Sequence, residues 1–142
     1  MDKNFIMEWI SFADRNLGIA SHLEKYYRPT PLEDICFNCQ QAAEKYLKGY
    51  LVYAANSLPP KTHDLRELCV LCVQQDKRFA QLMKACGILN PYSVQPRYPR
   101  ETYIDEALMQ KALYYAAEIK SFPPLAELRE KLGLEVPHDP HP

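Results

Sequence analysis

Glycine is scarce in this sequence. Only four of the 142 residues are glycine, whereas proline occurs twelve times. Most of these prolines stand between apolar stretches or near the C-terminal end, which is typical of the connections in a helical protein. The composition therefore argues against a fold rich in β-strands. The length fits one domain whose core needs no disulfide or metal to hold it together.

A net charge is almost absent. Seventeen Lys and Arg residues stand against eighteen Asp and Glu residues, which leaves a formal charge of -1. No global electric field therefore draws the protein to nucleic acid or to an anionic membrane. Any site for a polyanion must be a local patch.

Long apolar runs are missing too. No stretch reaches the roughly 18 uncharged apolar residues that a membrane-spanning helix needs. The first residues lead into an amphipathic segment that contains Glu8 and Asp14, so we expect neither a signal peptide nor a membrane anchor. The odd number of cysteines, five, all in helix-patterned apolar stretches, indicates reduced thiols. These features predict a cytoplasmic protein.

Apolar residues instead recur at three- and four-residue steps, which predicts helices. We expect four main helices and a short terminal one at about 4–27, 34–55, 64–75, 103–121 and 125–132, and a further short helical piece ends near Gly87. The resulting expectation is an all-α domain over residues 1–133: an antiparallel up-and-down bundle of four main helices plus the short terminal helix. A disordered tail rich in Pro and His is expected over 134–142.

The second of these helices carries polar residues opposite its apolar seams. Helical spacing stacks Gln41, Glu44, Lys45 and Lys48 into one ridge. A solvated helix face with a Glu44–Lys48 ion pair explains this ridge as well as a binding surface does.

The start of the third helix is the next candidate. Asp64 and Glu67 have the spacing of a capping box, which places His63 at a helix N-terminus. His63 is either a proton donor or acceptor near neutral pH or a residue that only fixes the loop, and we favour the structural role. Residues 90–102 form a loop that contains three prolines, Arg97 and Arg100.

Two cysteine pairs have the spacing of a zinc site. They are Cys36 with Cys39 and Cys69 with Cys72. Both pairs are embedded in apolar helix faces, where cysteine packs as a small hydrophobe. We therefore predict core packing and no metal or other cofactor.

The segment ICFNCQQAAEKYLK, residues 35–48, resembles the signature second helix of prokaryotic HEPN domains. It is followed in the family's order by PKTHDL at 60–65 and by Arg97-Tyr98-Pro99, and preceded by an aromatic first helix around Trp9. The resemblance covers roughly residues 4–122, and the motifs are specific in combination.

This resemblance implies a dimeric helical bundle, often encoded beside a minimal nucleotidyltransferase, and some such pairs act as toxin and antitoxin. The family also contains metal-independent ribonucleases with an Arg, four to six residues and a His. Here no His follows Arg97 or Arg100 before the tail. Arg15 and His22 have the spacing, but they lie in the first helix, away from the motif's place.

We therefore expect a homodimeric HEPN binding module that partners a minimal nucleotidyltransferase, binds an ATP-like nucleotide or RNA, and performs no covalent chemistry itself. Lys and Arg suit phosphate, an aromatic ring suits a base, and amides at the third helix's start would add donors. The predicted nucleotide-binding residues are Gln41, Lys45, Lys48, Lys61, His63, Arg97 and Tyr98. The alternatives are a metal-independent ribonuclease toxin that uses His63 with Arg97 or Arg100, or a purely structural dimer.

Overall fold

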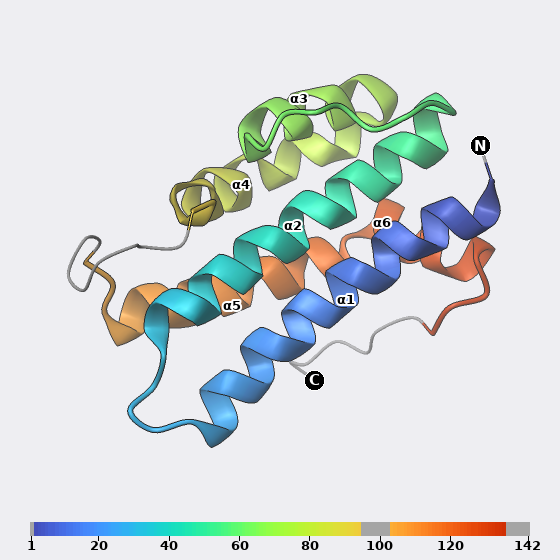
Figure 1. Ribbon diagram of the computed structural model, residues 1–142. Helices are drawn as coiled ribbons and strands as arrows, with labels where there is room; N and C mark the ends of the chain where they lie inside the picture. The colour runs from blue at the N-terminus through green and yellow to red at the C-terminus, as the bar shows by residue number, and fades with distance from the viewer. Residues whose placement is uncertain (1, 95–102, 136–142) are drawn as a thin grey trace.

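The computed structural model describes residues 2–94 and 103–135, and in these residues the chain is all-α with no strand (Figure 1). Six α-helices and two short 3-10 helices pack side by side. The elements are α1 (Lys3–Tyr26), α2 (Leu32–Ala55), α3 (Leu65–Gln75), η1 (Lys77–Leu82), α4 (Met83–Leu89), η2 (Asn90–Tyr92), α5 (Glu106–Ser121) and α6 (Pro123–Lys131).

The first two helices begin and end where the sequence provides a cap or a break. The Asp2 carboxylate accepts a hydrogen bond from the Asn4 amide and caps α1. Helix α2 starts directly after Pro31 and ends at Ala55, and the next residue, Asn56, has a φ of 52° in the left-handed region. Both helices match their predicted ranges closely.

Helix α2 is the central element, packed against α1, α3 and α5 (Figure 1). It runs antiparallel to α1, and Gly49 of α2 lies close against α1. A Cβ atom built on Gly49 would lie 3.0 Å from the Trp9 Cβ and 3.0 Å from the Ile10 Cδ1. The missing side chain therefore lets the two backbones come together.

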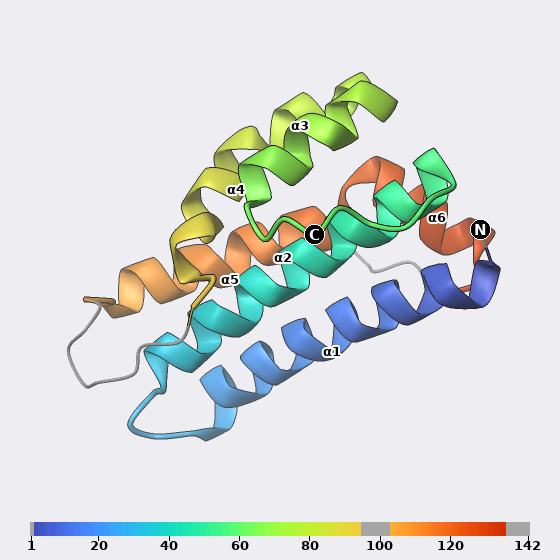
Figure 2. The same cartoon turned by 45° about the horizontal axis from the view of Figure 1, so that its top comes forward.

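The link between α2 and α3 departs from the predicted up-and-down alternation. Residues 56–64 run back along α2, so α3 points in the same direction as α2 (Figure 2). The contacts agree, because His63 meets Glu44 and Phe79 meets Tyr50. Nine extended residues span about 30 Å. The 24-residue α2 is about 36 Å long, so the link is long enough to return along most of α2. Pro59 and Pro60 favour that extended form.

The last two helices close the bundle. The Asp105 side chain accepts from the Leu108 amide at 2.8 Å and caps α5, so α5 begins later than the predicted Tyr103. Pro123 and Pro124 occupy the first turn of α6, and Gly133 follows its end with a φ of 74°. Leu134, the first residue of the predicted tail, packs against the core, and the Glu135 carbonyl accepts from Arg129 at 3.5 Å. Residues 136–142 lie outside the described residues.

The cysteines lie in the core, as predicted. Cys36, Cys39, Cys69, Cys72 and Cys86 are all fully buried and free of disulfides. Burial, together with the nearby charge of Glu33, raises the pKa of Cys36 to about 12, which keeps this thiol protonated at neutral pH. Within residues 2–94 and 103–135, no helix is both long enough and apolar enough to cross a bilayer.

Candidate functional site

A polar face lies on α2 between α1 and the link that leads to α3. We call it the α2 polar face, and its members are Gln40, Gln41, Glu44, Lys45 and Lys48 of α2, Asn16 of α1, and Lys61 and His63 of the link. Because three segments distant in sequence supply these side chains, the packing of α1, α2 and the link assembles the site.

Much of this face is buried rather than solvated. Glu44 and Lys48 are only 6% and 5% exposed, and Gln40 is fully buried. The prediction of a solvent-facing ridge is therefore wrong for Glu44 and Lys48. Helical spacing counts this side of α2 as outer surface, but the link at 56–64 runs along it and covers it (Figure 2).

The Glu44 carboxylate is the centre of the buried part. Its Oε2 accepts from Lys48 Nζ at 3.1 Å and lies 3.0 Å from His63 Nδ1. Its Oε1 accepts from Gln40 Nε2 at 3.4 Å. The predicted i,i+4 ion pair of Glu44 and Lys48 is therefore present, but it is buried, and Glu44 neutralises the charge of Lys48.

Lys45 faces the other way, toward α1. Its Nζ donates to Asn16 Oδ1 at 2.6 Å, and Asn16 Nδ2 donates in turn to Asn38 Oδ1 at 3.0 Å. Burial lowers the pKa of Lys45, Glu44 offsets part of this effect, and the nearby Arg15 lowers the pKa further. Lys45 is therefore a half-buried lysine held against α1 by Asn16.

The remaining predicted site residues differ in their placement. Gln41 is half-buried and donates to Gln40 Oε1 at 2.8 Å, which joins it to the buried network. Lys61 is exposed on the link, two residues before His63. Arg97 and Tyr98 lie outside the described residues.

The amides at the start of α3 are already engaged. Arg66 and Glu67 donate to Asp64 Oδ1 at 2.9 and 3.3 Å, and the Leu65 amide donates to Asn90 Oδ1 at 2.9 Å. The predicted cap at Asp64 is confirmed. The expectation that these amides add donors for phosphate is wrong, because the side chains of Asp64 and Asn90 accept from them.

The structure contains a second polar cluster that the sequence did not predict. Asp14 of α1 accepts from Arg129 of α6, which donates through Nη1 at 3.0 Å and also through Nη2. Tyr46 donates its hydroxyl proton to the same carboxylate, and Lys120 lies 3.7 Å away. Arg129 is only 5% exposed. No sequence pattern links Asp14 to Arg129, because they meet only in the folded chain.

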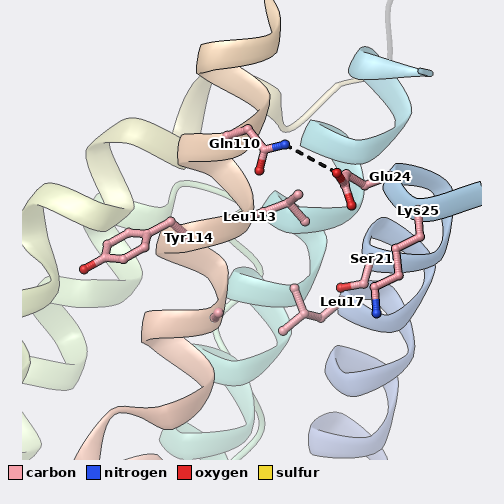
Figure 3. Close-up of a pocket in the computed structure, with 8 residues that line it drawn as sticks. Leu17, Ser21, Glu24, Lys25, Gln110, Leu113 and Tyr114 are labelled. Atoms are coloured by element: carbon pink, nitrogen blue, oxygen red, sulfur yellow. Dashed lines mark hydrogen bonds between the residues drawn. The ribbon is translucent and has the colours of Figure 1, made fainter. Parts of the chain in front are cut away.

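A groove of about 450 Å³ lies between α1 and α5 (Figure 3). Leu17 and Leu113 form its apolar floor, and a hydrogen bond of 3.4 Å from Gln110 Nε2 to Glu24 Oε1 joins the two helices along it. Its rim carries one lysine, Lys25, beside Glu24. This groove therefore lacks the cluster of cations that phosphate requires.

Arg15 and His22 each contact an aromatic ring of their own helix, α1. Arg15 lies over the Phe12 ring, and His22 packs against Tyr26 with ring centroids 4.9 Å apart. Six residues lie between Arg15 and His22, so their Cα atoms are about 10 Å apart along the axis of α1. In the described part of the chain, no group of three or more His, Cys, Asp or Glu residues is arranged to hold a metal ion.

The helices and their packing define a helical domain with a polar face, formed by side chains of α1, α2 and the following link. A comparison with protein families identifies the domain: residues 6–124 match the HEPN domain, and the chain belongs to the HEPN domain family. No curated protein and no solved structure matches the chain.

Proposed function

We propose that the protein is a HEPN-domain binding module that takes up a nucleotide, or the nucleotide portion of RNA, on the α2 polar face. One observation carries the proposal. Glu44, Lys48 and Gln40 form a buried hydrogen-bonded network. At the surface, the exposed imidazole of His63 contacts Glu44.

Such a network is costly if it serves only stability. Desolvating a carboxylate and an ammonium costs several kcal/mol per ion before their attraction offsets it, as a rough figure. Packed apolar residues are often as stable or more stable at such positions. A buried ion pair that ends in an exposed, oriented side chain is better explained by a role in binding.

The charges on this face suit a phosphate. Lys45 and Lys61 are cationic, Arg15 of α1 lies near Lys45, and the buried Lys48 offsets the charge of Glu44. Lys45 and Lys61 are the proposed phosphate ligands, because neither is paired with a carboxylate in the contacts described above. Gln41 would add an amide, and Lys48 would support the site from within.

The family resemblance supports the rest of the proposal. Arg97 and Tyr98 are proposed as a further phosphate ligand and a base-stacking ring. A minimal nucleotidyltransferase is the proposed protein partner, in a pair of the toxin and antitoxin type, and the module itself performs no covalent chemistry. A homodimer is also proposed, and exposed apolar side chains of α1, Phe12, Ile19 and Tyr26, support it.

A titration of purified protein with ATP, other nucleotides and short RNA tests the binding site. The variants are Lys45→Met with Lys61→Ala, since Met keeps the buried stem of Lys45. Lys84→Ala, an exposed lysine of α4, is the matched control for lost positive charge. Lys48→Ala is unsuitable, because it would leave Glu44 buried without its ammonium partner.

We expect saturable binding that weakens at least about tenfold in the double variant and stays unchanged in Lys84→Ala, since each charge-assisted contact contributes about 1.5–3 kcal/mol. Equal binding by all three proteins would contradict the site. Cleavage of RNA by the purified protein would instead favour the ribonuclease alternative. No binding of any ligand would favour the purely structural dimer.

A further inference from the structure

The imidazole of His63 is exposed but held in one orientation. Its side chain is 75% exposed, whereas the Glu44 carboxylate that it contacts is 8% exposed. The contact joins His63 Nδ1 to Glu44 Oε2 at 3.0 Å. An exposed histidine at a loop ordinarily samples several rotamers, so a buried acceptor for one ring nitrogen sets this residue apart.

Glu44 is itself fixed by its buried neighbours. Lys48 donates to Oε2 at 3.1 Å and Gln40 donates to Oε1 at 3.4 Å, so the carboxylate cannot turn away from the link. Gln40 is held in turn by Gln41, which donates to its Oε1 at 2.8 Å. A chain of contacts that begins inside α2 thus ends at His63.

This geometry sets which ring nitrogen faces solvent. With Nδ1 directed at the carboxylate, the Nδ1 proton is donated to Glu44, and Nε2 lies on the far side of the ring. In the neutral imidazole Nε2 is then a proton acceptor. In the imidazolium it is a donor, the form that an anion requires.

The charge of the cluster depends on that one proton. Glu44 and Lys48 cancel, so the three side chains carry no net charge with a neutral imidazole and one positive charge with an imidazolium. Of the other charged groups, Lys45 of α2 is close enough to Glu44 for the two charges to interact, and three more belong to the segment of His63 itself. Lys61 adds a positive charge, Asp64 caps α3 and accepts from Asn90, and Glu67 accepts from Thr62 at 2.8 Å.

We propose that His63 Nε2 contacts the phosphate of the bound nucleotide and that binding is coupled to the uptake of one proton by His63, with Glu44 and Lys48 as positioning residues. The inference rests on the proposed nucleotide site and adds its regulation by pH. Imidazole is the side-chain group that ordinarily gains a proton near neutral pH, so the test spans that range.

The test measures binding of a dinucleoside monophosphate between pH 5.5 and 8.5, because a phosphodiester does not titrate there. The variants are His63→Gln, which keeps a polar side chain, and Glu44→Gln combined with Lys48→Met. The double variant removes both buried charges together, so that neither is left unpaired. Thermal melts establish that each variant is folded, and ¹⁵N shifts of the His63 ring report its tautomer.

For wild type we expect the Kd to rise by up to about tenfold per pH unit on the alkaline side, as one-proton linkage requires. The Kd of His63→Gln should not depend on pH. The double variant should bind more weakly at low pH and should show a mixture of His63 tautomers.

Saturable binding with the same pH dependence in wild type and His63→Gln would overturn the proton coupling and leave the nucleotide site intact. An unchanged tautomer in the double variant would overturn the positioning role of Glu44 and Lys48. Absence of binding to wild type at every pH would overturn the proposed function, and the inference with it.

Discussion

Arg129, near the end of α6, holds the carboxylate of Asp14 in the middle of α1 with two guanidinium nitrogens. The two residues lie far apart in sequence, and Tyr46 of α2 donates to the same carboxylate. Three helices therefore meet at one acidic side chain. Arg129 is almost fully buried, and the carboxylate of Asp14 offsets its buried positive charge.

Loss of Asp14 should destabilise the fold. Asp14→Ala leaves the Arg129 guanidinium buried without its partner, and we expect the free energy of unfolding to fall by about 2–4 kcal/mol. Urea unfolding followed by circular dichroism measures this. Glu127→Ala is the control, because it removes the exposed ion pair with Arg78, and it should change stability little. Equal losses in both variants would contradict the assigned role of Asp14.

The same carboxylate predicts a loss of stability in acid. Burial raises the pKa of Asp14, but hydrogen bonds from Arg129 and Tyr46 lower it more, so the pKa lies below the usual 3.8. A carboxyl with a lowered pKa contributes stability that is complete above its unfolded-state pKa and is lost as the pH falls through its folded-state pKa.

The difference in unfolding free energy between wild type and Asp14→Asn should therefore be largest near pH 6 and should narrow below about pH 4. Urea titrations at pH 6, 4 and 3 measure it. A difference that stays constant down to pH 3 would show that Asp14 titrates alike in the folded and unfolded chain.

Two glycines should respond to alanine with opposite signs. A Cβ at Gly49 meets Trp9 and Ile10 at 3.0 Å, whereas nothing lies within 4 Å of a Cβ at Gly18. Gly18→Ala should stabilise α1 by about 0.5–1 kcal/mol, because alanine is the better helix former. Gly49→Ala should destabilise by about 1–3 kcal/mol through overpacking. Thermal melts of the two variants measure these changes in stability. Stabilisation by both changes would mean that α1 and α2 are not in close contact at Gly49.

The cap of α3 provides a further test. Asp64→Ala removes the acceptor of the Arg66 and Glu67 amides and of Asn90 Nδ2, and we expect a loss of about 1 kcal/mol. Asp64→Asn keeps an acceptor oxygen and should lose less. Hydrogen exchange of the Arg66 and Glu67 amides should rise in the alanine variant only. Unchanged exchange would contradict the cap.

The long helices could be predicted from the sequence because their apolar periodicity is strong. The α2 seams, the cap at Asp64 and the Gly133 stop are local signals, and each helix end lies near its predicted position. The return of the 56–64 link along α2 could not be predicted. An extended segment with two prolines fits either a bridge across the bundle or a path along one helix.

That one connection explains the errors in the site. Period counting assigns Glu44 and Lys48 to the solvated side of α2, whereas in the fold both are buried and His63 of the link contacts Glu44. The contact between Glu44 and His63 is tertiary and has no sequence pattern of its own. The pair of Asp14 and Arg129 could not be predicted either, because these residues also meet only in the folded chain.

The central claim is that the ligand binds on the α2 polar face. The most direct measurement is the shift of backbone and side-chain ¹H–¹⁵N signals when ATP or a short RNA is added to the labelled protein. The account predicts that the shifted signals cluster at Gln41, Lys45, Lys61 and His63 and saturate together. Saturable shifts confined to the α1–α5 groove, around Leu17, Gln110 and Tyr114, would contradict it.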